Sequence, residues 1–210
     1  MEIFGKTVPP QWLDVLSLVH SLSPEALLAG GCIRDLVLGG PVKDLDIFVD
    51  ASSDDHWSDL CSVLQFRHGW CPVTQINADY VASMRSEVAK VVGFRVPGFP
   101  LEVQIIGLKT LLYPMDALNR MDFGACQIGM SHHQHVFYTP AAHKDLTERR
   151  ITMLEPGDAT QELRSLRRAE RFAEKYRYSD VIVLRTGPSA RFAADFPDTW
   201  TDGYDEALGG

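Results

Sequence analysis

The stretch Leu27–Val49, which reads LLAGGCIRDLVLGGPVKDLDIFV, decides the fold of this chain. Two glycines, Gly30 and Gly31, precede an apolar run at helical spacing that stops at the next pair of glycines. The run Asp44–Val49 is rich in β-branched and aromatic residues and predicts a strand. Because side chains alternate along a strand, its two aspartates point to one side and its apolar residues to the other. The sequence therefore predicts a strand, a glycine turn, a helix and a second strand in this order.

The two aspartates of this strand, Asp44 and Asp46, indicate a metal site. Carboxylates on one strand face repel each other and resist burial unless a cation neutralises them. Oxygen ligands of this kind suit Mg²⁺, which keeps several waters and bridges to substrate phosphates. Upstream, Gly30 and Gly31 allow the backbone to approach an anion closely, and a helix N-terminus offers free N–H donors. The stretch thus combines a candidate phosphate cradle with a candidate Mg²⁺ site.

This stretch resembles the nucleotidyltransferase signature of class II CCA-adding enzymes and bacterial poly(A) polymerases. The family pattern is Gly-Gly, Arg-Asp, Leu-Gly and Asp-x-Asp, which stands here as Gly30-Gly31, Arg34-Asp35, Leu38-Gly39 and Asp44-x-Asp46. The alternative interpretation is a surface loop followed by an acidic strand end. The resemblance extends over about residues 25–178 and implies an α/β (α+β) nucleotidyltransferase fold, a small mixed sheet flanked by helices and followed by a neck helix.

The resemblance also implies a set of site residues. The metal ligands, which are the catalytic residues of a two-ion Mg²⁺ mechanism, are Asp44, Asp46 and Glu102. Glu102 opens a predicted strand, residues 101–106, and an exposed edge-strand position is the alternative for it. Asp35 is expected to brace Arg34 or the glycine turn. The nucleotide-binding residues implied by the resemblance are Gly30, Gly31, Arg34, Arg120, Asp122, Glu162, Arg164, Arg168 and Arg171.

The sequence departs from the family pattern at identifiable positions. Met121 stands where the second Arg of an Arg-Arg-Asp element is found, which removes a bidentate phosphate donor. Gly124-Ala125-Cys126 replaces Thr-Ile-Asn. In the neck helix, Glu162 and Ser165 occupy the Asp and Arg positions of the element that selects C or A in the family.

Other elements are predicted from periodicity and turn residues. Apolar residues at helical spacing predict helices over 11–22 and 54–65, and most clearly over 161–177. Strands are predicted at 27–29, 88–96 and 179–184, and a hairpin at 127–139. The histidines of that hairpin, His132, His133 and His135, are imidazoles that suit zinc or nickel, but short spacings on a hairpin tip seldom converge on one ion. His20 is interpreted as a histidine at the solvent edge of its helix.

Composition limits the possible classes of protein. The 210 residues are 45% hydrophobic and 23% charged, which is typical of a soluble globular protein. No apolar run has the length of a membrane span and no secretory leader is recognisable, so we expect a cytoplasmic protein without a membrane partner. The four cysteines lack CxxC spacing, which predicts neither a zinc site nor a disulfide framework. We expect a head domain over 1–152, a neck-like helix over 153–178 and a C-terminal arm over 179–210.

Charge is unevenly distributed along the chain, whose net charge is −8. Residues 143–191 hold 11 basic and 8 acidic side chains, whereas residues 192–210 hold no basic and 5 acidic ones. The basic block permits contact with phosphates and the acidic end repels them.

The expected function is therefore a Mg²⁺-dependent nucleotidyl transfer from an NTP, ATP or CTP, to an acceptor hydroxyl, with an RNA 3′ end such as that of tRNA as the favoured acceptor. The family's helical body and tail domains have no room in 210 residues, so an oligomer or a partner protein is an open expectation. A protein or small-molecule acceptor is a subordinate alternative. A non-catalytic head that binds nucleotide or RNA is the alternative from another class.

Overall fold

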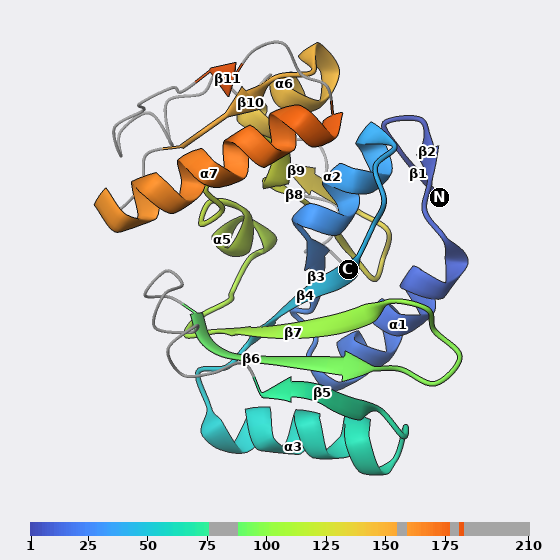
Figure 1. Ribbon diagram of the computed structural model, residues 1–210. Coiled ribbons are helices and arrows are strands. Elements are labelled where there is room, and N and C mark those ends of the chain that lie inside the picture. Colours follow the sequence, from blue (N-terminus) through green and yellow to red (C-terminus); the bar gives the residue numbers. More distant parts are fainter. Residues whose placement is uncertain (76–87, 155–158, 177–180, 183–210) are drawn as a thin grey trace, which may run out of the picture.

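A mixed β-sheet organises the computed structural model, which describes residues 1–75, 88–154, 159–176 and 181–182 (Figure 1). In these residues seven strands form the sheet, in the order β5-β6-β7-β4-β3-β8-β9. In chain order its strands are β3 (Leu27–Ala29), β4 (Asp44–Asp50), β5 (Cys71–Gln75), β6 (Val88–Arg95), β7 (Glu102–Leu108), β8 (Ile128–Ser131) and β9 (Val136–Tyr138). Two short pairs lie outside it, β1 (Glu2–Ile3) with β2 (Lys6–Thr7), and β10 (Ile151–Thr152) with β11 (Val181–Ile182).

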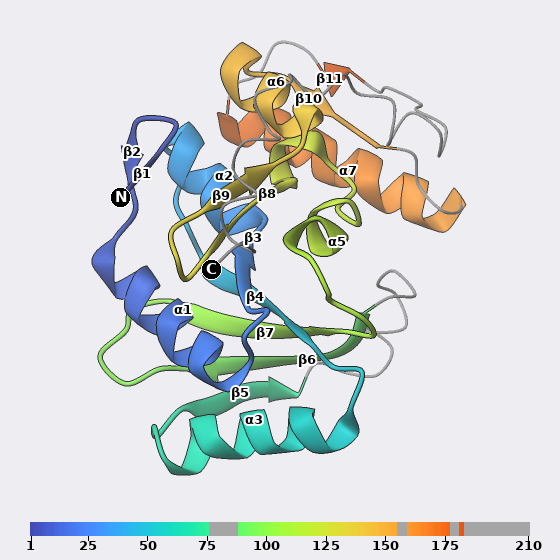
Figure 2. The same cartoon turned by 180° about the vertical axis from the view of Figure 1, so that it is seen from behind.

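Helices flank the sheet, which confirms the predicted α/β fold class. They are α1 (Pro10–Leu22), α2 (Gly31–Leu38), α3 (Asp54–Phe66), α5 (Pro114–Leu118), α6 (Pro140–Glu148) and α7 (Ala159–Tyr176), together with the 3-10 turn η1 (Gly124–Cys126). Seen from behind, α1 lies across the sheet while α5 and α7 lie on the other side (Figure 2). None of the helices in the described ranges is long and apolar enough to cross a membrane.

Parallel pairing of β4 with β7 is the centre of the sheet. The seven residues of β4 pair without a break with those of β7, from Asp44 beside Glu102 to Asp50 beside Leu108. On its other side β7 pairs antiparallel with β6. The alternative of an exposed edge strand for Glu102 is therefore wrong, because β7 is an interior strand.

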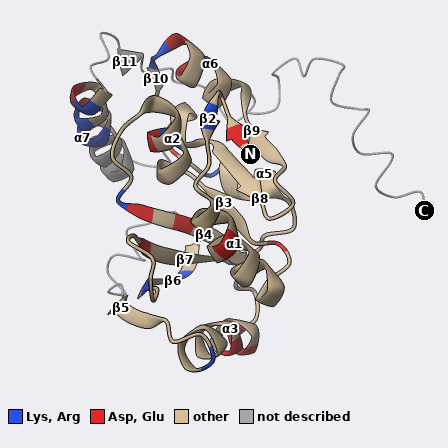
Figure 3. Cartoon of the chain, turned by 90° about the vertical axis from the view of Figure 1, so that its right-hand side faces the viewer, with Lys and Arg blue, Asp and Glu red and all other residues tan. Residues whose placement is uncertain are grey.

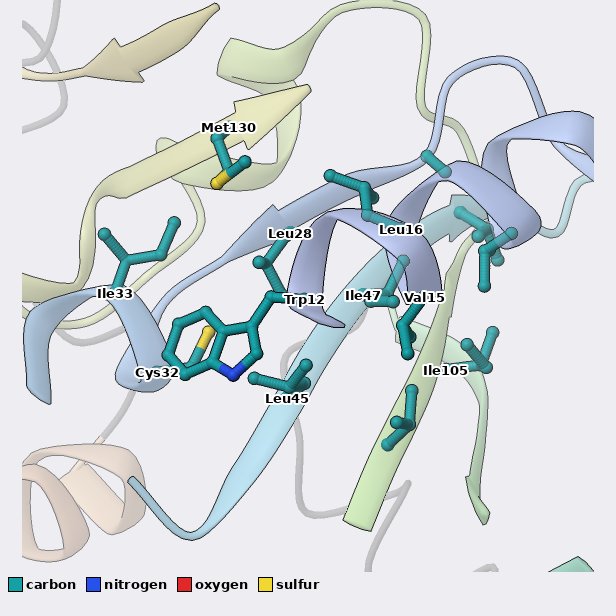
Figure 4. Close-up of a cluster of buried hydrophobic side chains, with 14 of the residues drawn as sticks. Trp12, Val15, Leu16, Leu28, Cys32, Ile33, Leu45, Ile47, Ile105 and Met130 are labelled. Atoms are coloured by element: carbon teal, nitrogen blue, oxygen red, sulfur yellow. The ribbon is translucent and has the colours of Figure 1, made fainter. Parts of the chain in front are cut away.

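The main hydrophobic core fills the face of the sheet that α1 covers. Side chains from α1, α2 and the central strands meet there in one buried cluster, in which Leu45, Ile47 and Ile105 have no exposed surface (Figure 4). A second cluster on the opposite face joins α5 to the strands, with Leu27, Ile106 and Leu118 among its members. Alternation along β4 thus places Leu45 and Ile47 in the main core and leaves Asp44 and Asp46 on the face toward α5.

Glycine is required by the backbone conformation at both ends of α2. Gly30 caps the N-terminus of α2 at φ 86°, and Gly39 ends the helix in the left-handed region at φ 73°. Residues with a Cβ rarely adopt either conformation. The glycine pairs therefore set both limits of the short helix that follows β3.

Most predicted elements occur, and the elements without a prediction are short. The structure confirms the helices over 11–22, 32–38, 54–65 and 161–177 within a few residues, together with the strands over 27–29, 44–49, 88–96 and 101–106 and the hairpin over 127–139. Only Val181 and Ile182 of the strand predicted over 179–184 lie within the described residues, and they form β11. Seven elements of the described residues were not predicted, namely β1, β2, β5, β10, α5, α6 and the 3-10 turn η1. Their sequences carry weak periodicity, and Pro at the start of both helices reads equally well as a turn.

A buried aspartate of α6 connects three segments. Asp145 has no exposed surface, and its carboxylate accepts hydrogen bonds from the backbone N–H of Ala125 at 2.8 Å and of Thr152 at 2.9 Å. The Thr152 hydroxyl donates to it at 2.7 Å. The Nε of Arg150 approaches the same carboxylate at 3.4 Å. The side chain of Asp145 therefore holds η1 and β10 against α6.

Replacing this aspartate should destabilise the protein strongly. We expect Asp145→Ala to lower the free energy of unfolding by about 2–4 kcal/mol, because two buried N–H groups lose their acceptor. Chemical denaturation followed by circular dichroism measures the change. Glu148→Ala on the same helix is the matched control, since the Glu148 side chain is 54% exposed and pairs with Arg150, and we expect it to cost below about 1 kcal/mol. Equal losses in the two variants would contradict the role assigned to Asp145.

Candidate functional site

Three carboxylates share the sheet face that carries α5. Asp44 lies directly beside Glu102 in the β4–β7 pair, and Asp46 lies beside Gln104. All three acids are partly exposed, whereas their neighbours along each strand are buried. The Nε2 of Gln104 donates to the Oδ2 of Asp44 at 3.3 Å. The predicted metal ligands are therefore aligned on one face, and the sequence reasoning missed Gln104, which the two-residue period from Glu102 would have placed there.

The carboxylate of Glu102 extends over β6, away from the two aspartates. A side chain at Gly93 of β6 would overlap it, so the glycine leaves room for this carboxylate. In the described part of the chain, the one group of three side chains whose ligand atoms gather closely enough for a metal ion lies elsewhere. The three carboxylates share a face but are not drawn together around one point.

Burial, together with crowding of negative charge, raises the pKa of both aspartates. Burial, and then the neighbouring charge of Asp44, raises the pKa of Asp46 from its usual 3.8 to about 7. The pKa of Asp44 is raised as well, by burial and by the charge of Asp35. Burial and a nearby carboxylate both disfavour the charged form, and a bound cation would relieve both effects.

The glycine turn passes directly beside Asp46. A Cβ placed on Gly30 would lie 3.7 Å from the Oδ2 of Asp46 and 3.4 Å from the methyl carbon of Met121. One placed on Gly31 would lie 3.9 Å from the same oxygen. The turn and Asp46, which were predicted to act together, are therefore neighbours, and Met121 packs against the turn.

The guanidinium of Arg34 is occupied by protein groups. Its Nη2 lies 2.7 Å from the carboxylate of Asp35, which confirms that Asp35 braces it. Its Nε donates to the hydroxyl of Tyr176 at 3.2 Å, and its Nη1 lies 2.9 Å from the sulfur of Cys126. The ring of Phe172 covers it at 4.1 Å. Arg34 is only 6% exposed, so in this conformation it faces α7 and not solvent.

Helix α7 is held over the site by two sets of polar contacts, one at Asp122 and one at Asp35. Asp122 accepts from the hydroxyl of Ser165 at 2.8 Å and pairs with Arg168 at 2.7 Å. Nearer the end of the helix, the ammonium of Lys175 lies 2.7 Å from Asp35, and the Tyr176 hydroxyl donates to the same carboxylate. The sequence reasoning placed Tyr176 in the apolar stripe of the helix, and its spacing carried no signal that its hydroxyl meets Asp35.

The remaining predicted residues fall into three groups. Arg120 is partly exposed beside Asp122, and Arg171 is exposed on α7. Arg168 and Asp122 are engaged with each other. The side chains of Glu162 and Arg164 lie outside the described part of the structure. Both basic and acidic positions lie on α7, and acidic positions lie on the central strands below it (Figure 3).

Solved structures with similar folds are enzymes that act on tRNA or bind nucleotides. A tRNA-processing enzyme in apo form I is 20% identical with a TM-score of 0.59, over 80% of this chain and 43% of that one. A CCA-adding enzyme with CTP is 19% identical with a TM-score of 0.59, over 85% of this chain and 41% of that one. The Thermotoga maritima CCA-adding enzyme complexed with tRNA is 17% identical with a TM-score of 0.60, over 90% of this chain and 42% of that one.

These likenesses show the nucleotidyltransferase fold that the sequence resemblance implied, and this chain spans less than half the length of those proteins. No curated protein matches the sequence. The sequence analysis did not anticipate the family to which the chain belongs, which differs in name from the enzymes of similar fold. A family model matches residues 9–149, well over half of the chain, and by this match the chain belongs to the Gabija anti-defense 2 family.

Proposed function

We propose that this chain is a Mg²⁺-dependent nucleotidyltransferase, which moves a nucleoside monophosphate from an NTP to an acceptor hydroxyl and releases pyrophosphate. The observation that carries this proposal is the alignment of Asp44, Asp46 and Glu102 on one sheet face beside the Gly30–Gly31 turn. We also propose that the reaction serves the anti-defence role against Gabija that the family name states.

The donor set fits Mg²⁺. All three side chains offer oxygen atoms, which are the ligands that this ion prefers. Burial and the charge of Asp44 raise the pKa of Asp46 although Arg34 and Arg168 lower it, so these two arginines do not fully neutralise the negative charge there. When bound, the metal ions would supply charge neutralisation at the phosphates and a lowered pKa of the acceptor hydroxyl. Asp44, Asp46 and Glu102 would hold them there.

The chain's own groups would position the nucleotide. The φ of 86° at Gly30 turns the backbone into α2, whose N-terminal N–H groups are suited to an anion. Arg120 is partly exposed and directly precedes Met121, which packs against the glycine turn, and it would contact phosphate or ribose. Asp122 would accept a hydrogen bond from a ribose hydroxyl only after giving up its contacts with Ser165 and Arg168.

An RNA 3′ end is the acceptor we favour. Arg167 and Arg171 are exposed on α7, where they can meet phosphates. The solved structures of similar fold include one complexed with tRNA. The matched part of those proteins is less than half of their length, so their activity on tRNA does not transfer with the fold.

One observation favours a second function, a non-catalytic nucleotide sensor. Arg34, predicted to contact the triphosphate, is buried against Asp35, Cys126 and Tyr176. A site in which this arginine stays occupied by protein groups would bind nucleotide more weakly and hold it less well for attack.

Transfer of labelled nucleotide tests the enzymatic proposal. The full chain is incubated with Mg²⁺, each α-labelled NTP in turn, and a lysate of cells that carry the Gabija defence. We expect label in macromolecules, and we expect Asp44→Asn and Asp46→Asn each to lower it by about a hundredfold or more, because the oxygen charge that holds the ions is lost. Ribonuclease or protease digestion of the product then identifies the acceptor class.

The matched control is Asp59→Asn, since Asp59 is an exposed aspartate of α3 and lies outside the site. It should transfer label as the unaltered chain does. Nucleotide binding without transfer, together with an anti-defence effect that survives both site substitutions, would establish the sensor and rule out the enzyme.

The raised pKa of Asp46 predicts a pH-dependent stability. Between about pH 4 and 7 the unfolded chain carries an ionised Asp46 while the folded chain holds its proton, so this residue makes stability fall as the pH rises. Asp46→Asn removes that loss. Without Mg²⁺ we expect the substitution to increase the free energy of unfolding by about 2 kcal/mol more at pH 8 than at pH 5. Urea titrations at the two pH values measure it, and an equal effect at both would refute the assignment.

A further inference from the structure

Three histidines from two distant parts of the chain meet at one end of the sheet. His20 belongs to the last turn of α1, and His132 and His133 belong to the turn between β8 and β9. The ring centroids of His20 and His132 are 3.8 Å apart, and those of His132 and His133 are 4.0 Å apart. One ring nitrogen from each of the three lies within 4.8 Å of the others.

The fold holds both segments in place. β8 pairs with β3 so that Ser131 lies beside Leu27, the first residue of β3. Helix α1 ends a few residues before Leu27, and its last turn is anchored by Val19, which has no exposed surface. The β8–β9 turn is closed by backbone hydrogen bonds from Ser131 to His135 and from Gln134 to Ser131, each at 3.0 Å. The imidazoles are thus carried by two fixed elements and not by a loose loop tip.

This arrangement places bases together without an acid. Within the described residues, no hydrogen bond or ion pair connects the three rings to a carboxylate, and no acid or cysteine belongs to the group. Neutral imidazoles are good ligands for divalent transition metals.

We propose that His20, His132 and His133 form a binding site for one divalent transition-metal ion of the zinc class. Three imidazoles with open positions for water are a recurrent donor set for Zn²⁺. The bound ion would link the end of α1 to the β8–β9 turn. His135, whose ring centroid lies 6.2 Å from that of His133, stands outside the group.

This site differs from the carboxylate site in position and in chemistry. His132 and His133 directly follow Ser131, which pairs with Leu27 at the start of β3, whereas the turn at Gly30, next to Asp46, follows the end of β3. Nitrogen donors select zinc, nickel, cobalt or copper, while the oxygen donors of Asp44 and Asp46 select Mg²⁺. The two sites should therefore be loaded independently.

Metal titration of the tag-free, chelator-treated full chain tests the proposal. We expect Zn²⁺ to bind with one ion per chain by calorimetry, to raise the melting temperature, and to be retained in excess Mg²⁺. Co²⁺ serves as an optical probe, because its visible absorption reports nitrogen ligands and coordination number. We expect His20→Ala and His132→Ala each to weaken Zn²⁺ binding at least about tenfold, since each removes one ligand.

Two controls keep the result specific. His68→Ala removes an exposed histidine beyond α3, and Asp44→Asn alters the carboxylate site; neither should change Zn²⁺ affinity. Far-ultraviolet circular dichroism of each metal-free variant checks that it is folded. The proposal is overturned if the unaltered chain binds no stoichiometric Zn²⁺, if His20→Ala binds as tightly as the unaltered chain, or if Asp44→Asn abolishes Zn²⁺ binding.

Discussion

The parallel register of β4 against β7 is the constraint on which the rest of the structure depends. It buries Leu45 and Ile47 against the core and sends Asp44 and Asp46 to the opposite face. A slip of one residue would move the aspartates into the core and the apolar residues out of it. The fold would then be destabilised, because unpaired carboxylates would be buried. The hydrophobic pattern that selects the fold therefore also selects which face carries the acidic groups.

Local chemistry explains why so much of this region could be predicted. The glycine turn, α2 and β4 follow one another within Leu27–Asp50, and each is specified by its own residues: positive φ at Gly30 and Gly39, helical spacing between them, and alternation afterwards. The strand that Glu102 opens was predicted from its own alternation, whereas the place of Glu102 beside Asp44 was expected only from the family resemblance. The bracing of Arg34 by Asp35 joins adjacent residues, so it too is a local feature.

What sequence reasoning missed depends on segments that are far apart. The partners of Arg34 include Tyr176, 142 residues away, and an apolar stripe does not reveal which of its members carries a hydroxyl to a buried carboxylate. His20 was interpreted as a solvent-edge residue because only the pairing of β8 with β3 brings the hairpin to the end of α1. The anti-defence family was beyond prediction for another reason, since a shared fold specifies neither the acceptor nor the biological target.

The packing of α7 and the binding of a nucleotide draw on the same arginine. Arg34 holds α7 through the hydroxyl of Tyr176 and the ring of Phe172, and it shares Asp35 with Lys175. A phosphate that binds Arg34 must replace these contacts. The exchange breaks charge-assisted hydrogen bonds within the protein and forms bonds of similar strength to the phosphate. Nucleotide affinity through Arg34 is therefore set by a difference between two states of α7 and not by the phosphate contact alone. Asp122 adds to this dependence, because Ser165 and Arg168 hold it from the same helix. The position of α7 is thus coupled to the site by charge as well as by apolar packing.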